Sequence, residues 1–315
     1  MSSDESRPGT AQQDAVPHGA TPGSADDPRL ITQALLREWS LPAPTGSKYS
    51  RGQVTVIGGA RRSPGAAMLA GTAALRMGAG RLTLAVAEGV AAHVAVAIPE
   101  SGVIALPEDA SGTVTGEGVA PLLEKELSRA DAVLLGPGLD DAEATVRLIE
   151  EIVPLLPDGL PVVLDAYAAT ALPAVRQDCA DRLAGRVVVT PNEHELGFLV
   201  GDEESGDDVP TGIRKVVERF DAVVACSGWV GCAQGFWKNA TGDTGLGTSG
   251  SGDVLAGAVV GLITRGAPMP QALVWGVYSH AAAGDRLASE FGRVGYLAGE
   301  LLPELPLVLA ALRGD

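Results

Sequence analysis

A glycine-rich segment near the C-terminal end of the chain carries the strongest chemical signal. Residues 245–253 read Gly-Leu-Gly-Thr-Ser-Gly-Ser-Gly-Asp. Such glycines can turn backbone N–H groups inward, and a helix beginning near Asp253 would add the positive end of its dipole, so the segment predicts a phosphate site. It is not a Walker loop, because no Gly-Lys-Thr/Ser follows, and the Rossmann glycine loop would instead follow the first strand.

The carboxylate of Asp253 is unexpected in this setting, because it would repel the phosphate beside it. Asp is among the best helix N-caps, so the residue could serve only to cap the helix. A kinase also needs a base among its phosphate-binding amides, to accept the proton of the hydroxyl that is phosphorylated. The residues alone leave both interpretations open.

The elements that must position this segment alternate between strands and helices. Strands are predicted at 53–57, 81–87, 131–135, 161–164, 186–189 and 221–225, with an antiparallel edge strand at 231–237. Helices are predicted at 30–39, 65–77, 253–264 and 270–289. This order predicts an α/β fold, a doubly wound and mostly parallel sheet with helices on both faces, in a single domain over 29–315 after a disordered leader over 1–28. Ligands of such sheets bind beyond the carboxyl ends of the strands.

Composition argues against several classes of function. With 23 Lys and Arg against 39 Asp and Glu, the net charge of −16 disfavours binding to nucleic acid or to an anionic membrane surface. The helix candidate at 254–264 is far shorter than the roughly 20 residues of a membrane span, and no apolar N-terminal stretch suggests a secretory signal. Three cysteines without a CxxC predict neither a disulfide scaffold nor a zinc ribbon, and fit a cytoplasmic location.

Residues 248–257, Thr-Ser-Gly-Ser-Gly-Asp-Val-Leu-Ala-Gly, resemble the signature of the ribokinase-like superfamily. Other segments follow the order found in ADP/ATP-dependent NAD(P)H-hydrate dehydratases, also called YjeF-related carbohydrate-kinase domains. They are residues 48–59, 64–80, 136–139, 190–191 and 277–285. The resemblance extends from about Lys48 to Pro306, and it implies a ribokinase-like fold over most of the chain.

The resemblance implies the repair of damaged nicotinamide cofactor. ADP or ATP, with Mg²⁺, would phosphorylate the hydroxyl of hydrated NADH or NADPH, and loss of phosphate would restore the ring double bond. Asp253 would be the catalytic base, and it would contact the hydrate together with Ala67, Gly138 and Asn192. The nucleotide and its phosphates would bind Ser227, Gly228, Trp229, Val230, Gly231, Gly250, Ser251 and Gly252. Glu195 would help to organise the magnesium ion.

Three positions depart from the family's pattern. Asn192 stands in place of a His, Tyr167 in place of the second Asp of Asp-Ala-Asp, and Ser227 in place of the Lys in a strand-ending Lys-Gly. Tyr167 would share the strand face of Asp165, where a protonated phenol supplies no negative charge. Two alternatives therefore stay open: a kinase acting on a sugar or a vitamin precursor, and a non-catalytic nucleotide-binding relative. The retained Asp253 favours an enzyme.

The expected partners are small molecules, namely the hydrated cofactor and an adenine nucleotide, rather than nucleic acid or membrane. A homo-oligomer is expected, and a separate epimerase could act in the same pathway. The remaining chemistry-bearing side chains have simpler explanations. We expect His280 to be packed in the interior or at an interface, and Cys226 and Cys232 to be buried thiols.

Overall fold

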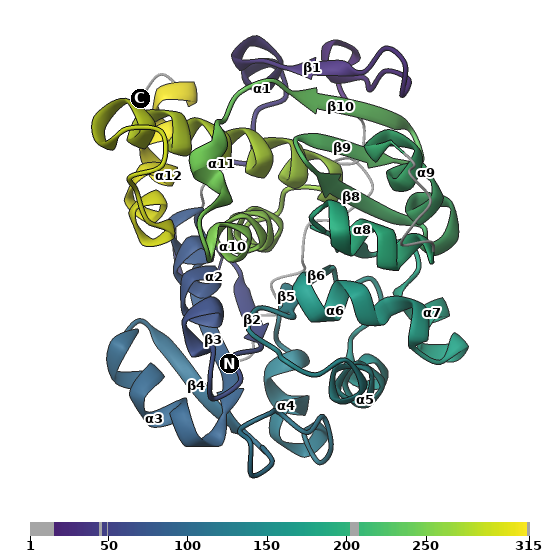
Figure 1. Ribbon diagram of the computed structural model, residues 1–315, viewed down its shortest axis with the longest axis vertical. Coiled ribbons are helices and arrows are strands. Elements are labelled where there is room, and N and C mark those ends of the chain that lie inside the picture. The colour runs from purple at the N-terminus through teal and green to yellow at the C-terminus, as the bar shows by residue number, and fades with distance from the viewer. Residues whose placement is uncertain (1–15, 44–45, 49, 202–207, 314–315) are drawn as a thin grey trace, which may run out of the picture.

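A ten-stranded sheet with helices on both faces forms the body of the molecule (Figure 1). The computed structural model describes residues 16–43, 46–48, 50–201 and 208–313. Within them the strand order is β1-β10-β9-β8-β7-β6-β5-β2-β3-β4, with parallel pairing throughout except on both sides of β9. The predicted fold class, a doubly wound and mostly parallel sheet, is confirmed.

The parallel strands are short and apolar because both faces of the sheet are covered. They are β2 (Gln53–Ile57), β3 (Arg81–Ala87), β4 (Ser101–Leu106), β5 (Ala132–Leu135), β6 (Val162–Leu164), β7 (Val187–Val189) and β8 (Ala222–Cys226). Every residue of β2, β5, β6, β7 and β8 is buried. All of the predicted parallel strands are present, most of them with ends shifted by one residue, and β4 is an additional one.

The predicted edge strand over 231–237 is wrong, because this stretch contains a turn. The antiparallel strands β9 (Trp229–Cys232) and β10 (Gly235–Asn239) flank Ala233 and Gln234. Apolar and small residues continue on both sides of the turn, so their pattern does not show the reversal. Nor is β10 an edge, since β1 (Arg29–Ile31) pairs with it in parallel.

The helices form two groups, each with its own apolar cluster. One face carries α1 (Gln33–Glu38), α2 (Pro64–Arg76), α10 (Ser251–Thr264), α11 (Met269–Phe291) and α12 (Ala298–Arg313). The other carries α4 (Ala120–Leu127), α5 (Ala142–Ile152), α6 (Ala166–Ala171), α7 (Gln177–Leu183), α8 (Glu193–Val200) and α9 (Val209–Phe220). Helix α3 (Glu88–Ala97) lies against β4. None of the described helices is both long enough and apolar enough to cross a membrane.

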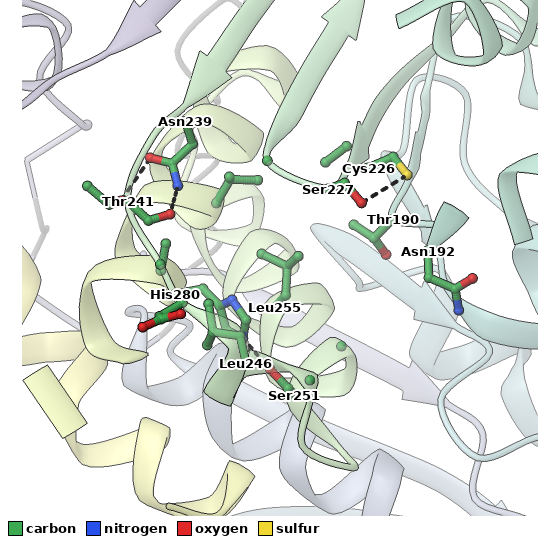
Figure 2. Close-up of a pocket in the computed structure, with 18 of the residues that line it drawn as sticks. Thr190, Asn192, Cys226, Ser227, Asn239, Thr241, Leu246, Ser251, Leu255 and His280 are labelled. Carbon is green, nitrogen blue, oxygen red and sulfur yellow. Dashed lines mark hydrogen bonds between the residues drawn. The ribbon is translucent and has the colours of Figure 1, made fainter. Parts of the chain in front are cut away.

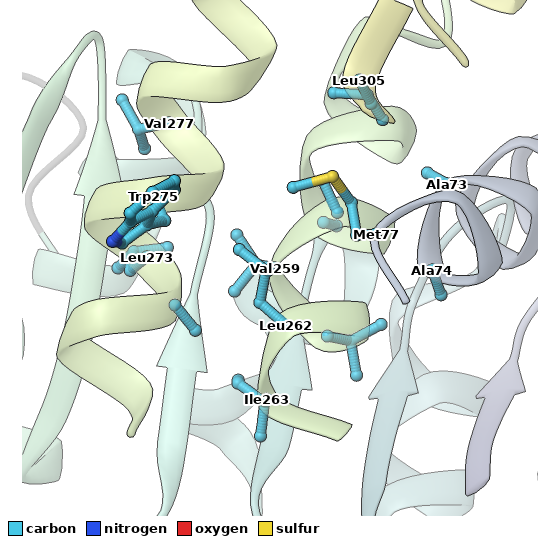
Figure 3. Close-up of a cluster of buried hydrophobic side chains, with 14 of the residues drawn as sticks. Ala73, Ala74, Met77, Val259, Leu262, Ile263, Leu273, Trp275, Val277 and Leu305 are labelled. Carbon is cyan, nitrogen blue, oxygen red and sulfur yellow. The ribbon is translucent and has the colours of Figure 1, made fainter. Parts of the chain in front are cut away.

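Helices α2 and α10 pack backbone to backbone. A Cβ on Gly257 would lie 2.1 Å from the carbonyl oxygen of Ala70, and one on Gly261 would lie 2.5 Å from that of Ala74. Further along the same helix, Val259 and Leu262 are buried in a cluster with Met77 and Trp275 (Figure 3). Because α10 is held on both sides, the position of its first turn is fixed relative to α2.

The N-terminal segment differs from the expected leader where the structure describes it; residues 1–15 lie outside the described residues. Ala20 is fully buried, and its carbonyl accepts a hydrogen bond from Nε1 of Trp237 at 2.9 Å. Gly23 exchanges two backbone hydrogen bonds with Phe236. The helix predicted over 30–39 begins only at Gln33, after the Thr32 N-cap, because the residues before it form β1. Residues 16–31 thus extend the sheet beyond β10.

Candidate active site

A cavity of about 640 Å³ opens between the β8–β9 hairpin and the start of α10, at the carboxyl ends of the strands (Figure 2). Pockets of about 300–1,000 Å³ are typical for small-molecule ligands. Its walls come from three segments that are distant in sequence and from α11. The lining residues are 190–192, 225–228, 239–243, 246–247, Ser251, Gly252, Leu255, Val277, His280 and Ala281.

The start of α10, where the glycine segment predicts a phosphate site, forms one wall of the cavity. The N-cap is Gly250, whose φ of 88° is in the left-handed region and whose Cβ would lie 2.6 Å from Leu69 Cδ1. Ser251 and Gly252 follow and line the cavity. The first N–H groups of a helix lack intrahelical partners, so this turn can donate hydrogen bonds to an anion.

Asp253 is the third residue of α10, so its interpretation as the N-cap is wrong. Its side chain is half-buried. Burial, and after it the negative charge of Glu195, together raise the pKa of Asp253 to about 6. A carboxylate with such a pKa suits a general base near neutral pH better than an ordinary aspartate does.

Asp165 brings a second perturbed carboxyl group to the ends of the neighbouring strands. It follows β6, is buried, and accepts a hydrogen bond of 2.8 Å from Oγ1 of Thr190, which follows β7. Burial is the main cause that raises the pKa of Asp165 to about 7, and the charges of Asp253 and Glu195 add to it. Perturbed carboxyl groups that influence one another are characteristic of active sites.

A histidine of α11 forms a hydrogen bond with Ser251. The Ser251 hydroxyl lies 2.9 Å from Nε2 of His280, and both side chains are buried (Figure 2). Burial lowers the pKa of His280 to about 4, so the imidazole is neutral near pH 7. The expectation of a packed histidine is confirmed, and its partner is a residue of the predicted phosphate loop.

Asn192 and Glu195 make a reciprocal capping box at the start of α8. The Glu195 N–H donates to Asn192 Oδ1 at 2.9 Å, and the Asn192 N–H donates to Glu195 Oε2 at 3.0 Å. Asn192 also lines the cavity. Asn at position 192 is therefore a helix cap, which is among the strongest uses of this residue type.

The expected magnesium site is not built from protein groups alone. The described residues contain no group of three or more His, Cys, Asp or Glu side chains that could hold a metal ion. Mg²⁺ in phosphoryl-transfer sites is usually bound by one or two carboxylates together with the phosphates of the substrate. Glu195 fits this description, because its charge reaches Asp253 and Asp165.

Ala67 and Gly138 come together beside the start of α2, outside the 640 Å³ cavity. Gly138 has a φ of 74°, and its carbonyl accepts hydrogen bonds from Ser63 Oγ and the Ala60 N–H. A Cβ on Gly59 would lie 3.3 Å from the Cβ of the fully buried Ala67. Leu69 of the same helix meets Gly250, so these residues adjoin the first turn of α10.

Only the first two residues of the predicted nucleotide segment over 227–231 line the cavity. Ser227 and Gly228 line the cavity and form the two-residue turn between β8 and β9, with φ values of 47° and 77°. Trp229, Val230 and Gly231 are residues of β9 and lie outside the cavity lining. Val230 is fully buried, and a Cβ on Gly231 would lie 2.4 Å from Ile213.

Tyr167 does not share the face of Asp165. The strand ends before Asp165, Ala166 has a φ of 48°, and Tyr167 belongs to α6, so the alternation expected of a strand does not apply. Its side chain is 41% exposed and is not among the cavity-lining residues.

Sequence analysis found residues 245–247 of the wall formed by 239–247 but missed residues 239–243. Asn239 and Thr241 bond to each other through two hydrogen bonds, and the Gly242 N–H donates to Asp285 at 3.0 Å. Arg293 donates two hydrogen bonds of 2.6 Å to the Asp243 carboxylate. The only local signal is the run Asn-Ala-Thr-Gly-Asp, whose turn-forming residues lead directly into the glycine segment.

The doubly wound sheet, with a glycine-rich helix start and a carboxylate at the carboxyl ends of its strands, matches the ribokinase-like fold that the sequence resemblance implies. A family model described as NAD(P)H-hydrate dehydratase matches residues 54–307. The chain belongs to this family, which confirms the resemblance found in the sequence.

Individual relatives agree with the family match. The ADP-dependent (S)-NAD(P)H-hydrate dehydratase of Xanthomonas campestris is 39% identical over 290 residues, which cover 90% of this chain and 97% of that protein. A bifunctional NAD(P)H-hydrate repair enzyme of Moorella thermoacetica is 36% identical over 91% of this chain, but the match covers only 55% of that protein.

Solved structures show the same fold. The ADP/ATP-dependent NAD(P)H-hydrate dehydratase of Bacillus subtilis, co-crystallised with ATP and Mg²⁺, has a TM-score of 0.72 at 24% identity, with 90% of this chain and 98% of that chain covered. A ribokinase-like superfamily protein of Enterococcus faecalis has a TM-score of 0.76 at 23% identity, with 91% and 97% covered.

Proposed function

We propose that this protein uses ADP or ATP, with Mg²⁺, to convert hydrated NADH and NADPH back to NADH and NADPH. Membership of the family and the 39% identical ADP-dependent relative support this activity over a sugar or vitamin-precursor kinase. The observation that carries it is the placement of Asp253, a carboxyl group with a pKa of about 6, in the first turn of the phosphate-binding helix.

The nucleotide occupies the cavity with its phosphates at Ser251 and Gly252. The hydrated ring occupies the space beside Ala67 and Gly138, with its hydroxyl at Asp253. Mg²⁺, bound to the phosphates and to Glu195, would neutralise part of the phosphate charge.

Asp253 accepts the proton of the hydroxyl as the hydroxyl oxygen bonds to the terminal phosphorus and the bond from phosphorus to the bridging oxygen breaks. Phosphate then leaves with the electron pair of its C–O bond. A proton leaves the neighbouring ring carbon, passes to the phosphate, and the ring double bond is restored. The hydrogen bond between Ser251 and His280 holds the first turn of α10, and with it the N–H groups that face the phosphates, in place during both steps.

The test is a direct assay of NADH regeneration. Purified protein is mixed with hydrated NADH, MgCl₂ and either ADP or ATP, and the absorbance of NADH is followed. Asp253→Asn should lower the rate about 10²–10⁴-fold, as expected for loss of a general base. The matched control is Asp158→Asn, an exposed position before β6. A parental protein that regenerates no NADH with either nucleotide would refute the proposed function.

Three further expectations remain proposals: a homo-oligomer, a cytoplasmic location and a separate epimerase in the same pathway. The last is supported by the relatives named bifunctional, because this chain spans just over half of their length. Those relatives carry a second region that the present chain does not match.

A further inference from the structure

The two ends of the cavity differ in their chemistry (Figure 2). At one end Gly252 offers a helix N–H group, which only donates hydrogen bonds, whereas the Ser251 N–H donates to the carbonyl of Thr248 at 3.2 Å. The opposite wall is the turn of Ser227 and Gly228. No Lys or Arg is among the described residues that line the cavity, although an adenine nucleotide is strongly anionic. A Lys or Arg side chain that contacts the nucleotide must therefore reach it from just behind the described lining.

Lys238 lies in that position, behind the hairpin turn. It pairs with Trp229 across β9 and β10, and its ammonium is 4.7 Å from the centre of the indole ring. Nζ donates a hydrogen bond of 2.9 Å to the carbonyl of Ser227 and would lie 3.7 Å from a Cβ on Gly228. Both turn residues line the cavity, as does Asn239, the next residue after Lys238. The Lys238 ammonium thus lies at the same turn as Ser227, the position where the family's pattern has a Lys.

A carboxylate faces the same turn. Oε1 of Glu193, the first residue of α8, accepts a hydrogen bond of 2.6 Å from Ser227 Oγ. The partial burial of Lys238 lowers its pKa, while the charge of Glu193 acts in the opposite direction. The hairpin end therefore presents an anionic acceptor and a cationic donor within one network.

This combination fits the nucleoside part of a nucleotide better than its phosphates. Phosphate oxygens accept hydrogen bonds and would be repelled by Glu193. A nucleoside carries both acceptors, the ring nitrogens and ribose oxygens, and donors, the ribose hydroxyls and the exocyclic amine. The helix N-terminus at the other end supplies the site for the phosphates.

We propose that Lys238 is a specificity-determining residue of the nucleotide site, and that its ammonium donates a hydrogen bond to the nucleoside while the phosphates lie at Ser251 and Gly252. The inference rests on the proposed binding of nucleotide in this cavity. It assigns to β10 a ligand contact that lies outside the segments predicted from the family's pattern.

The experiment is a calorimetric titration with adenosine, AMP, ADP and ATP. Lys238→Met removes the charge but keeps an unbranched side chain over Trp229, and Lys238→Arg keeps the charge. Lys125→Met, at an exposed position of α4, removes the same charge far from the cavity and serves as the control. Melting temperatures establish that each variant is folded, and Lys238→Gln replaces Lys238→Met should the latter fail to fold.

We expect Lys238→Met to weaken the binding of adenosine, AMP, ADP and ATP by the same factor, about tenfold, as expected for one hydrogen bond to a charged group. Lys238→Arg should recover most of the affinity, and Lys125→Met should bind like the parent. Parental affinity in Lys238→Met would overturn the inference, and so would a loss that grows with the number of phosphates. Absence of ADP binding by the parental protein would refute the proposed nucleotide site itself.

Discussion

Thr190 Oγ1 donates a hydrogen bond of 2.8 Å to Oδ1 of Asp165, which joins the ends of β7 and β6 behind Asp253. Thr190 lines the 640 Å³ cavity, whereas Asp165 is buried and its pKa responds to the charge of Asp253. The pair therefore connects the wall of the cavity with the carboxyl groups beside the reacting hydroxyl.

The rate of NADH regeneration should depend on pH through Asp253. The base must be ionised, and its pKa is raised to about 6, so kcat/KM should fall by about tenfold per pH unit below pH 6. Glu195→Gln removes a neighbouring negative charge and should move this acid limb to lower pH, while loss of the proposed magnesium ligand should lower the rate at every pH. Gln also serves at the third position of a capping box, so α8 should keep its N-terminus.

The control for this shift is Glu124→Gln, an exposed carboxyl group on α4. Its pH profile should match that of the parent. An acid limb that stays in place in Glu195→Gln would contradict the electrostatic link between Glu195 and Asp253.

Stability should change with pH through Asp165. Its folded-state pKa of about 7 lies above the ordinary value, so the protonated form favours the folded state. This contribution is complete below about pH 4, the pKa in the unfolded chain, and is lost as the pH rises through 7. Asp165→Asn keeps an acceptor for Thr190 and carries no charge. At pH 8 the variant should be more stable than the parent, on the order of 1–3 kcal/mol. At pH 4 this stability difference should be smaller.

Urea unfolding of Asp165→Asn and the parent at both pH values measures this difference. Equal stability differences at pH 4 and pH 8 would show that Asp165 does not titrate between them in the folded protein.

Ser251 and His280 should behave as a coupled pair. Replacing His280 by Ala leaves a buried hydroxyl without its partner, which costs about 1–3 kcal/mol, whereas His280→Gln can keep the hydrogen bond. The double variant with Ser251→Ala should lose less than the sum of the single variants. Chemical unfolding gives the free energies, and ADP titrations show whether the phosphate wall is disturbed. Strict additivity would indicate that the two side chains do not interact.

Close packing of α2 and α10 should make Gly257 intolerant of a side chain. Gly257→Ala would force a Cβ to within 2.1 Å of the Ala70 carbonyl oxygen, and overpacking of this kind costs about 1–3 kcal/mol or more. Gly299→Ala on α12 is the matched control, because a Cβ there meets nothing within 4 Å. Replacing a helical Gly by Ala at an open position should stabilise the fold by up to about 1 kcal/mol. Thermal melts that shift in the same direction for both variants would argue against this packing.

The sequence was most informative where local pattern and burial agree. The runs at Gln53–Ile57 and Arg81–Ala87 are apolar stretches that end at glycines or at a helix start, and their predicted bounds match the structure. The turn at Ala233 and Gln234 was missed because neither residue is a typical turn former, and the signal of Gly235, which follows them with a φ of 137°, was not used. β1 was missed because it forms only by pairing with β10, far away in sequence.

The part of the candidate site that lies in one contiguous stretch was predicted, and the parts that depend on distant contacts were not. The glycine segment and Asp253 are contiguous, so their chemistry is visible in a single stretch of sequence. The partners that shape them are not contiguous. His280 is 29 residues from Ser251, and Arg293 is 50 residues from Asp243. The packing of α11 against α10 creates the first pair, and the second joins the segment that precedes α10 to the segment that follows α11. Local periodicity encodes neither contact.

The glycine contacts between α2 and α10 also restrict how the enzyme can open. Because the backbones of the two helices touch at Ala70 and Ala74, neither can slide or tilt without a steric clash along its length. Asp253, on one helix, and Ala67, on the other, therefore belong to a single rigid block. On the opposite side of the cavity, the β8–β9 hairpin and the 239–247 wall are instead held by hydrogen bonds that involve side chains and can break and re-form.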